Sequence, residues 1–131
     1  MTQKIEFILV SLYFIFISLY TFTFYKFKKL VESSNEISAR ISKKKKKEIG
    51  TKTIQAYYSK ISRLLRIKSC FVNCLALKFI YAYYGYSVKI ICGVKINKDN
   101  RVDGHAWIYY EGKLLSDKEE DIKGYKKSFV I

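Results

Sequence analysis

The chain has 131 residues and a formal net charge of +14, from 25 Lys and Arg against 11 Asp and Glu. That length leaves room for only one small domain. One histidine, three cysteines and no Cys-x2-Cys pair fit neither a zinc site nor a disulfide framework, so we expect no metal, no cofactor and a reduced, cytosolic-facing domain.

Residues 5–25 form the hydrophobic run IEFILVSLYFIFISLYTFTFY, in which Glu6 is the only charged residue. As a helix this run is about 30 Å long, enough for the hydrocarbon core of a bilayer, and it carries no polar stripe. Lysines follow at once, so the positive-inside rule predicts a single-pass cell-membrane anchor over residues 1–29 with the rest of the chain in the cytoplasm. A buried core helix is the alternative, which the small body disfavours because it could hardly surround such a helix.

Residues 30–52 are predicted to be a lysine-rich connector, helical in part, with five consecutive lysines at 43–47 and a break at Gly50. Between residues 26 and 68 there are 14 Lys and Arg against 3 Glu, so most of the net charge follows the hydrophobic run. Charge in that place indicates an anionic lipid surface, while a solvated charge run is the alternative. Nucleic acid is not an expected partner, because no aromatic residues are interleaved with the lysine run.

Two helices are predicted after the connector. The first covers residues 53–67, where a spacing of three and four marks one apolar face and indicates packing without chemistry. Its apolar positions are Ile54, Tyr57, Tyr58, Ile61, Leu64 and Leu65. The second runs from the N-cap Ser69 to the terminator Gly85, and Lys78 is its only charged residue, so most of its surface must be covered.

Cys70 lies in the first turn of the second helix. Unpaired backbone N–H groups and the positive end of the helix dipole lie beside a side chain at that position, which favours a thiolate. Cys74, one turn further on, is expected to lie behind Cys70 against the core. Cys74 and Cys92 are therefore predicted to be packing residues.

The remainder of the chain has the composition of strands. Residues 86–94 and 105–110 are rich in β-branched and aromatic residues, and the turn cluster 97–100 separates them. A second turn at 111–113 leads to 114–117, and residues 129–131 are a candidate edge strand. The prediction is an α+β body in which a buried helix packs on an antiparallel meander.

A thiol, an imidazole and a carboxylate follow one another in the order Cys70, His105 and Asp117. Cys70 could attack a peptide carbonyl, His105 could exchange the proton, and Asp117 could orient the imidazole. The backbone N–H of Cys70 could help to bind the oxyanion. Each residue also has an ordinary reading, as a buried small hydrophobe, a structural histidine in a strand and a surface aspartate after a turn.

An ordered set of short elements lies between residues 69 and 117. It comprises Cys70-x3-Cys74-Leu75-Ala76-Leu77, Gly85, Ile91-Cys92-Gly93-Val94, His105-Ala106-Trp107 and Asp117. This set resembles the leader peptidases of lasso peptide biosynthesis, which are transglutaminase-like cysteine proteases. The chain departs from that pattern at four positions. Asn73 stands where arginine is usual, and Cys74 replaces a small residue. Gly104 replaces the alanine before the histidine, and Ser116 replaces asparagine.

The resemblance implies a small papain- or transglutaminase-like domain over residues 53–131 behind an N-terminal transmembrane helix. It implies Cys70 as nucleophile, His105 as base and Asp117 as the orienting carboxylate. The implied reaction removes the leader from a ribosomally made precursor peptide, after which a separate macrolactam cyclase closes the ring. A separate leader-recognition protein is implied as the partner that delivers the precursor.

Two alternatives stay open. A transglutaminase-like acyltransferase or deamidase acting on another small protein would keep the triad and change the acceptor. A basic membrane-anchored assembly or immunity protein without enzymatic activity would use only the anchor and the lysines.

Overall fold

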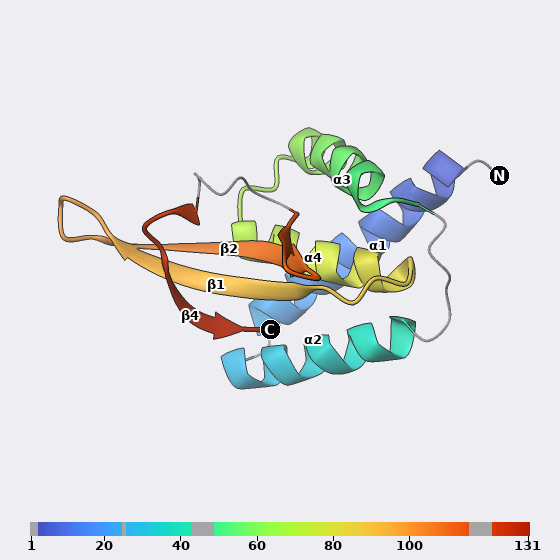
Figure 1. The fold of residues 1–131 in the computed structure, drawn as a ribbon. Helices are drawn as coiled ribbons and strands as arrows, with labels where there is room; N and C mark the ends of the chain where they lie inside the picture. Colours follow the sequence, from blue (N-terminus) through green and yellow to red (C-terminus); the bar gives the residue numbers. More distant parts are fainter. Residues whose placement is uncertain (1–2, 25, 43–48, 116–121) are drawn as a thin grey trace.

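The computed structural model describes residues 3–24, 26–42, 49–115 and 122–131. Within them four helices precede four strands, and the strands form one antiparallel sheet in the order β3-β2-β1-β4 (Figure 1). The predicted α+β class is confirmed. The elements are α1 (Gln3–Phe24), α2 (Phe27–Ser42), α3 (Thr51–Leu65), α4 (Cys70–Tyr83), β1 (Lys89–Ile96), β2 (Val102–Tyr110), β3 (Lys113–Leu114) and β4 (Lys126–Val130).

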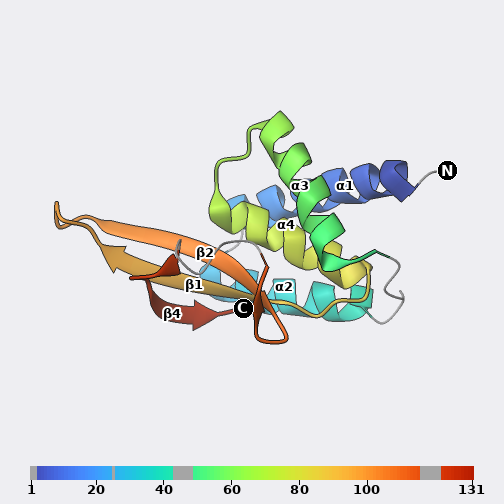
Figure 2. The ribbon, with the colours of Figure 1, turned by 45° about the horizontal axis from the view of Figure 1, so that its top comes forward.

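Helix α4 is the central element, because it packs against α1, α2 and α3 and against strands β1 and β2 (Figures 1 and 2). Its predicted start is confirmed, since the Ser69 hydroxyl accepts a hydrogen bond from the Val72 N–H at 3.3 Å. Its predicted terminator, Gly85, lies one residue beyond the C-cap with φ 91°, a left-handed conformation that favours glycine. The N–H of Tyr86 then closes the last turn on the carbonyl of Tyr81 at 2.8 Å.

Helix α1 lies along α4 and buries one face on it. Aromatic rings join the two helices: the Phe14 and Phe79 centroids are 5.7 Å apart and those of Phe22 and Phe71 are 5.7 Å apart. The Tyr83 hydroxyl also donates to Glu6 Oε1 at 2.9 Å. The helix therefore contributes to the core as well as to the surface.

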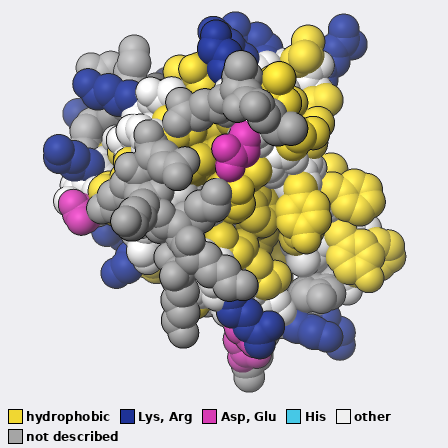
Figure 3. Space-filling model, turned by 90° about the vertical axis from the view of Figure 1, so that its right-hand side faces the viewer, with side chains coloured by type: hydrophobic (Ala, Val, Ile, Leu, Met, Phe, Trp, Pro, Cys, Tyr) yellow, Lys and Arg dark blue, Asp and Glu magenta, His cyan; other side chains and the backbone are white. Residues whose placement is uncertain are grey.

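The other face of α1 is exposed and apolar. By length and composition α1 is able to cross a membrane, with a mean hydropathy of 2.1 over 18 residues, and 33% of that window is buried inside the protein. Figure 3 shows hydrophobic side chains gathered over the centre and right of one face of the molecule, with Lys and Arg side chains toward its edges. The exposed apolar side chains of α1 are Ile5, Ile8, Leu9, Leu12, Tyr13, Phe16, Leu19, Tyr20, Phe22 and Phe24.

Helix α2 occupies much of the segment predicted as a connector. Leu30 and Ser34 are buried, and the helix packs on α4. Ile37 and Ile41 continue the same face and are partly buried. The partial helix expected here is confirmed, whereas its packing against α4 was not foreseen; the lysine run 43–47 lies outside the described residues, and the domain boundaries stay predictions.

Helix α3 buries only the first part of its predicted apolar face. Ile54 and Tyr58 are buried, whereas Leu64 is 83% exposed and Leu65 is 47% exposed, so the prediction was wrong for the two leucines. The helix ends at Leu65 because Arg66 adopts φ 57°, which turns the chain away before a further turn can pack.

The predicted meander is confirmed in β1, β2 and β3, and β4 joins the other side of β1 as an edge strand. Strand β1 begins at Lys89, three residues later than predicted, because Tyr86 closes the end of α4. In the register of β1 and β2, Gly93 faces His105 and Cys92 faces Ala106. The two-residue turn between β2 and β3 has positive φ at both positions, as the twist of a tight hairpin requires.

Candidate active site

Cys70 and His105 line the same pocket, which has a volume of about 350 Å³. Cys70 is the first residue of α4 and is partly exposed, and His105 lies on β2. The pocket lies between α3, the start of α4 and β2, and its other lining residues are Gln55, Tyr58, Ser59, Ser62, Arg63, Asn73, Cys74, Leu77 and Ala106. Both residues also line an adjoining hollow of about 260 Å³.

His105 is flanked by two aromatic side chains. Its ring centroid is 5.9 Å from that of Trp107 and 5.5 Å from that of Tyr125. Trp107 is 2% exposed and fills the space opposite Gly93, where a Cβ would lie 2.6 Å from the Trp107 ring. The absence of a side chain at Gly93 thus permits the Trp107 position beside the imidazole.

Asp117, the predicted third member of the triad, lies outside the described residues and stays a prediction. Leu115, two residues before it, still lies beside β2, because the Leu115 N–H donates to the Ile108 carbonyl at 2.9 Å.

Tyr125, which packs beside His105, was not singled out in the sequence analysis. Its hydroxyl also donates to Asp103 Oδ2 at 2.9 Å. Only its contact with His105 identifies it, and no local sequence signal does so.

The other two cysteines are buried, as predicted. Cys74 is 3% exposed in α4 and Cys92 is 7% exposed in β1. Burial, with an added effect of nearby Cys70, raises the pKa of the Cys92 thiol to about 11, so this sulfur stays protonated at neutral pH. Among the described residues no group of three or more His, Cys, Asp and Glu side chains could hold a metal ion.

Asn73, three residues after Cys70 in α4, ties that helix to α3. Its Oδ1 accepts hydrogen bonds from the Tyr58 hydroxyl at 2.7 Å and the Ser62 hydroxyl at 3.0 Å. Its Nδ2 donates to the Ile67 carbonyl at 3.3 Å. Burial, and secondarily Cys74, raises the pKa of Tyr58 well above its usual range, so the phenol remains a donor. Where arginine is usual in the lasso leader peptidases, this chain thus has an asparagine that binds the neighbouring helix α3.

We expect Asn73→Ala to lower the free energy of unfolding by about 1–3 kcal/mol, because it leaves the buried Tyr58 hydroxyl without its acceptor. Urea unfolding followed by circular dichroism measures the change. In a Tyr58→Phe background the same substitution should cost clearly less, since no buried hydroxyl is left unpaired. Equal losses in both backgrounds would contradict the network.

A family model described as "Transglutaminase-like superfamily" matches residues 23–130. The matched region contains α2, α3, α4 and the sheet, and with them Cys70 and His105. No curated protein and no solved structure matches the chain.

Proposed function

Because the chain belongs to the transglutaminase-like superfamily, we propose that it is a cysteine peptidase that removes the leader from a lasso peptide precursor. Members of this superfamily are typically cysteine-based enzymes, and such a domain is compatible with peptide hydrolysis or acyl transfer. The observation that carries the proposal is the shared pocket of Cys70, at the start of α4, and His105, on β2. The lasso precursor as substrate rests on the resemblance of the residues around them.

In the proposed reaction His105 accepts the proton of the Cys70 thiol, and the thiolate attacks the carbonyl carbon of the peptide bond. The backbone N–H groups at the start of α4 stabilise the oxyanion that forms. His105 then returns the proton to the leaving amine, and a thioester remains on Cys70. Water hydrolyses the thioester, and Asp117 holds the imidazole in the required tautomer throughout.

The proposed partners follow from the same reading. A separate leader-recognition protein presents the precursor, as the resemblance to the lasso leader peptidases implies. A macrolactam cyclase then uses the freed core N-terminus. We place the chain at the cytoplasmic face of an anionic membrane, supported by the exposed apolar side chains of α1 and the net charge of +14.

The proposal is tested by incubating the purified full chain with a precursor peptide and its recognition protein and weighing the products. Hydrolysis of the backbone bond gives two fragments whose masses sum to that of the precursor plus one water. A side-chain acyl transfer or deamidation leaves the backbone in one piece and would replace the peptidase assignment by the acyltransferase alternative. An unchanged precursor under conditions where the recognition protein binds it would contradict both.

A further inference from the structure

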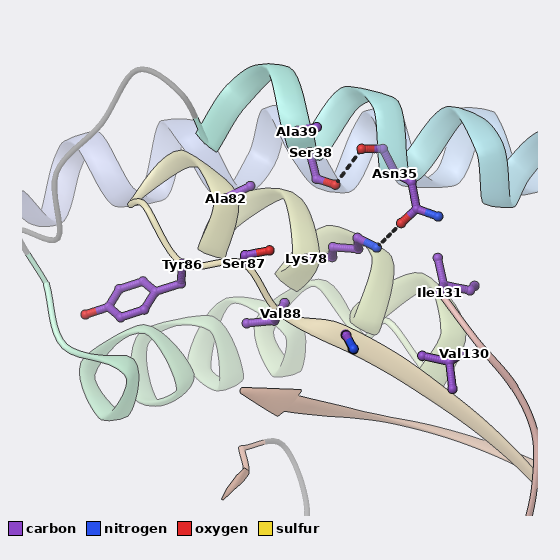
Figure 4. Close-up of a pocket in the computed structure, with 11 residues that line it drawn as sticks. Asn35, Ser38, Ala39, Lys78, Ala82, Tyr86, Ser87, Val88, Val130 and Ile131 are labelled. Atoms are coloured by element: carbon purple, nitrogen blue, oxygen red, sulfur yellow. Dashed lines mark hydrogen bonds between the residues drawn. The ribbon is translucent and has the colours of Figure 1, made fainter. Parts of the chain in front are cut away.

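A second cavity, of about 290 Å³, lies between α2, α4 and the ends of β1 and β4 (Figure 4). It shares no lining residue with the Cys70 and His105 pocket. Its walls come from parts of the chain that are distant in sequence: Asn35, Ser38, Ala39, Lys78, Ala82, Tyr86, Ser87, Val88, Lys89, Val130 and Ile131. The cavity is therefore formed by the tertiary fold and has no part in the proposed peptidase chemistry.

Lys78 places a cation in the wall of this cavity. The residue is 5% exposed, and its Nζ donates to Asn35 Oδ1 at 2.6 Å, the contact drawn in Figure 4. Burial lowers the pKa of Lys78 to about 8, so the ammonium is still mostly protonated at pH 7. A buried cation is costly unless a negative charge compensates it.

None of the described lining side chains is a carboxylate, and one of them is a second lysine, Lys89. The backbone oxygen of Ile131, which belongs to the same lining, accepts a hydrogen bond from the Ile90 N–H at 3.0 Å. The hydrogen bond to Asn35 uses one of the three N–H donors that an ammonium carries. Ser87 adds a hydroxyl group, and Ala39, Ala82 and Val88 add apolar wall. The hydroxyl of Ser38 already donates to the carbonyls of Ser34 and Asn35, at 2.8 and 3.2 Å. The lining thus offers positive charge and hydrogen-bond donors within a cavity large enough for a small group.

We propose that this cavity binds an anionic group, a phosphate or a carboxylate, with Lys78 as its principal contact. Asn35 holds the Lys78 side chain in place. Ser87 and Lys89, which are both exposed residues of the lining, are the further donors. A free small anion and a phospholipid headgroup both carry this chemistry. The site is independent of the proposed function, because its residues lie apart from Cys70 and His105.

The first test is thermal unfolding of the full chain in neutral detergent, followed by circular dichroism, with increasing sodium phosphate or sodium acetate. Chloride keeps the ionic strength constant, because a chain with a net charge of +14 attracts any anion. A site gives a saturable rise in Tm of several degrees with at least one anion. The rise should be lost in Lys78→Met and kept in Lys52→Met, which changes an exposed lysine on α3. An equal rise in both variants, or none in the unchanged protein, would overturn the proposal.

A second measurement uses the unchanged protein and does not depend on how the variant folds. Lysines are modified with a small amine-acylating reagent, and mass spectrometry follows Lys78 and Lys52. Bound phosphate or acetate should slow the modification of Lys78 severalfold and leave Lys52 unaffected; equal rates at Lys78 with and without the anion would contradict binding.

Flotation with phosphatidylglycerol or phosphatidylcholine vesicles distinguishes a phospholipid headgroup from a free small anion as the ligand. A phosphatidylglycerol preference lost only in Lys78→Met identifies a lipid headgroup, and a preference kept in that variant identifies a free anion.

Discussion

Cys70→Ala should lower the rate of precursor cleavage by roughly 10³-fold or more, because a cysteine peptidase without its thiolate has no nucleophile for the acylation step. The measurement is the initial rate of fragment release in the reconstituted assay, at saturating recognition protein. The partly exposed position of Cys70 at the start of α4 predicts little change in stability, so the loss should appear in the rate alone.

Cys74→Ala is the matched control, since it removes a thiol one turn away on the same helix. It should retain activity within a few-fold, because Cys74 is 3% exposed and packs in the core. Thiol alkylation at pH 7 adds an independent readout, in which Cys70 should react faster than Cys74 or Cys92. Cleavage by Cys70→Ala at the unchanged rate would refute the assignment of the nucleophile, and ordinary reactivity of Cys70 would favour the non-enzymatic alternative.

Gly93→Ala should destabilise the protein by about 1–3 kcal/mol and slow cleavage at the same time. A Cβ at this position would lie 2.6 Å from the Trp107 ring and 3.1 Å from Tyr125 Cβ. Trp107 is 2% exposed and cannot shift without moving its neighbours. Because Trp107 and Tyr125 flank the imidazole of His105, the shift should also displace the proposed base. Urea unfolding gives the stability, and kcat at saturating precursor gives the effect on His105.

Gly104→Ala provides the comparison within the same pair of strands. A Cβ at Gly104 meets nothing within 4 Å, and its φ is not positive. The substitution also restores the alanine that the lasso leader peptidases usually carry before the histidine. We expect stability and kcat to remain close to those of the unchanged protein. If both substitutions behaved alike, the packing of Trp107 against Gly93 would not be what holds His105.

Local sequence signals were sufficient where the chain's own backbone decides the structure. Ser69 and Gly85 set the ends of α4 through a side-chain acceptor and a positive φ, and both effects depend only on nearby residues. The turn between β2 and β3 follows in the same way from Glu111 and Gly112. The placement of Cys70 at a helix start could therefore be predicted.

Contacts between distant segments could not be predicted in this way. Helix α2 was read as part of a connector because its segment has few apolar residues and leads into the lysine run. Its buried face mixes Leu30 with Ser34, and a serine there contributes by being small. The partners of Asn73 and Lys78 lie on other helices, so no spacing in the sequence points to them. Leu64 and Leu65 fit the periodicity of α3, yet both stay exposed within the part of the chain that the structure describes.

The environment of α1 also depends on the tertiary fold. Its composition predicts a helix surrounded by lipid, but its buried positions follow one face and meet α4. Ser11 and Ser18, which are both 0% exposed, let the two helices approach closely on that face. A transmembrane helix and a buried core helix were treated as alternatives. In the structure α1 has one face buried against α4 and one exposed apolar face.

The packing of α1 bears on how the protein can be shortened for solution work. A hydrophobic N-terminal helix is commonly trimmed off to improve solubility, and here a cut before Lys26 would remove the rings of Phe7 and Phe14. These rings cover Tyr84 and Phe79, both 0% exposed, at centroid separations of 5.9 Å and 5.7 Å. Trimming would therefore expose the hydrophobic face of α4 in place of that of α1, and α4 would lose packing contacts. The exposed side chains of α1 are better targets for solubilising substitutions.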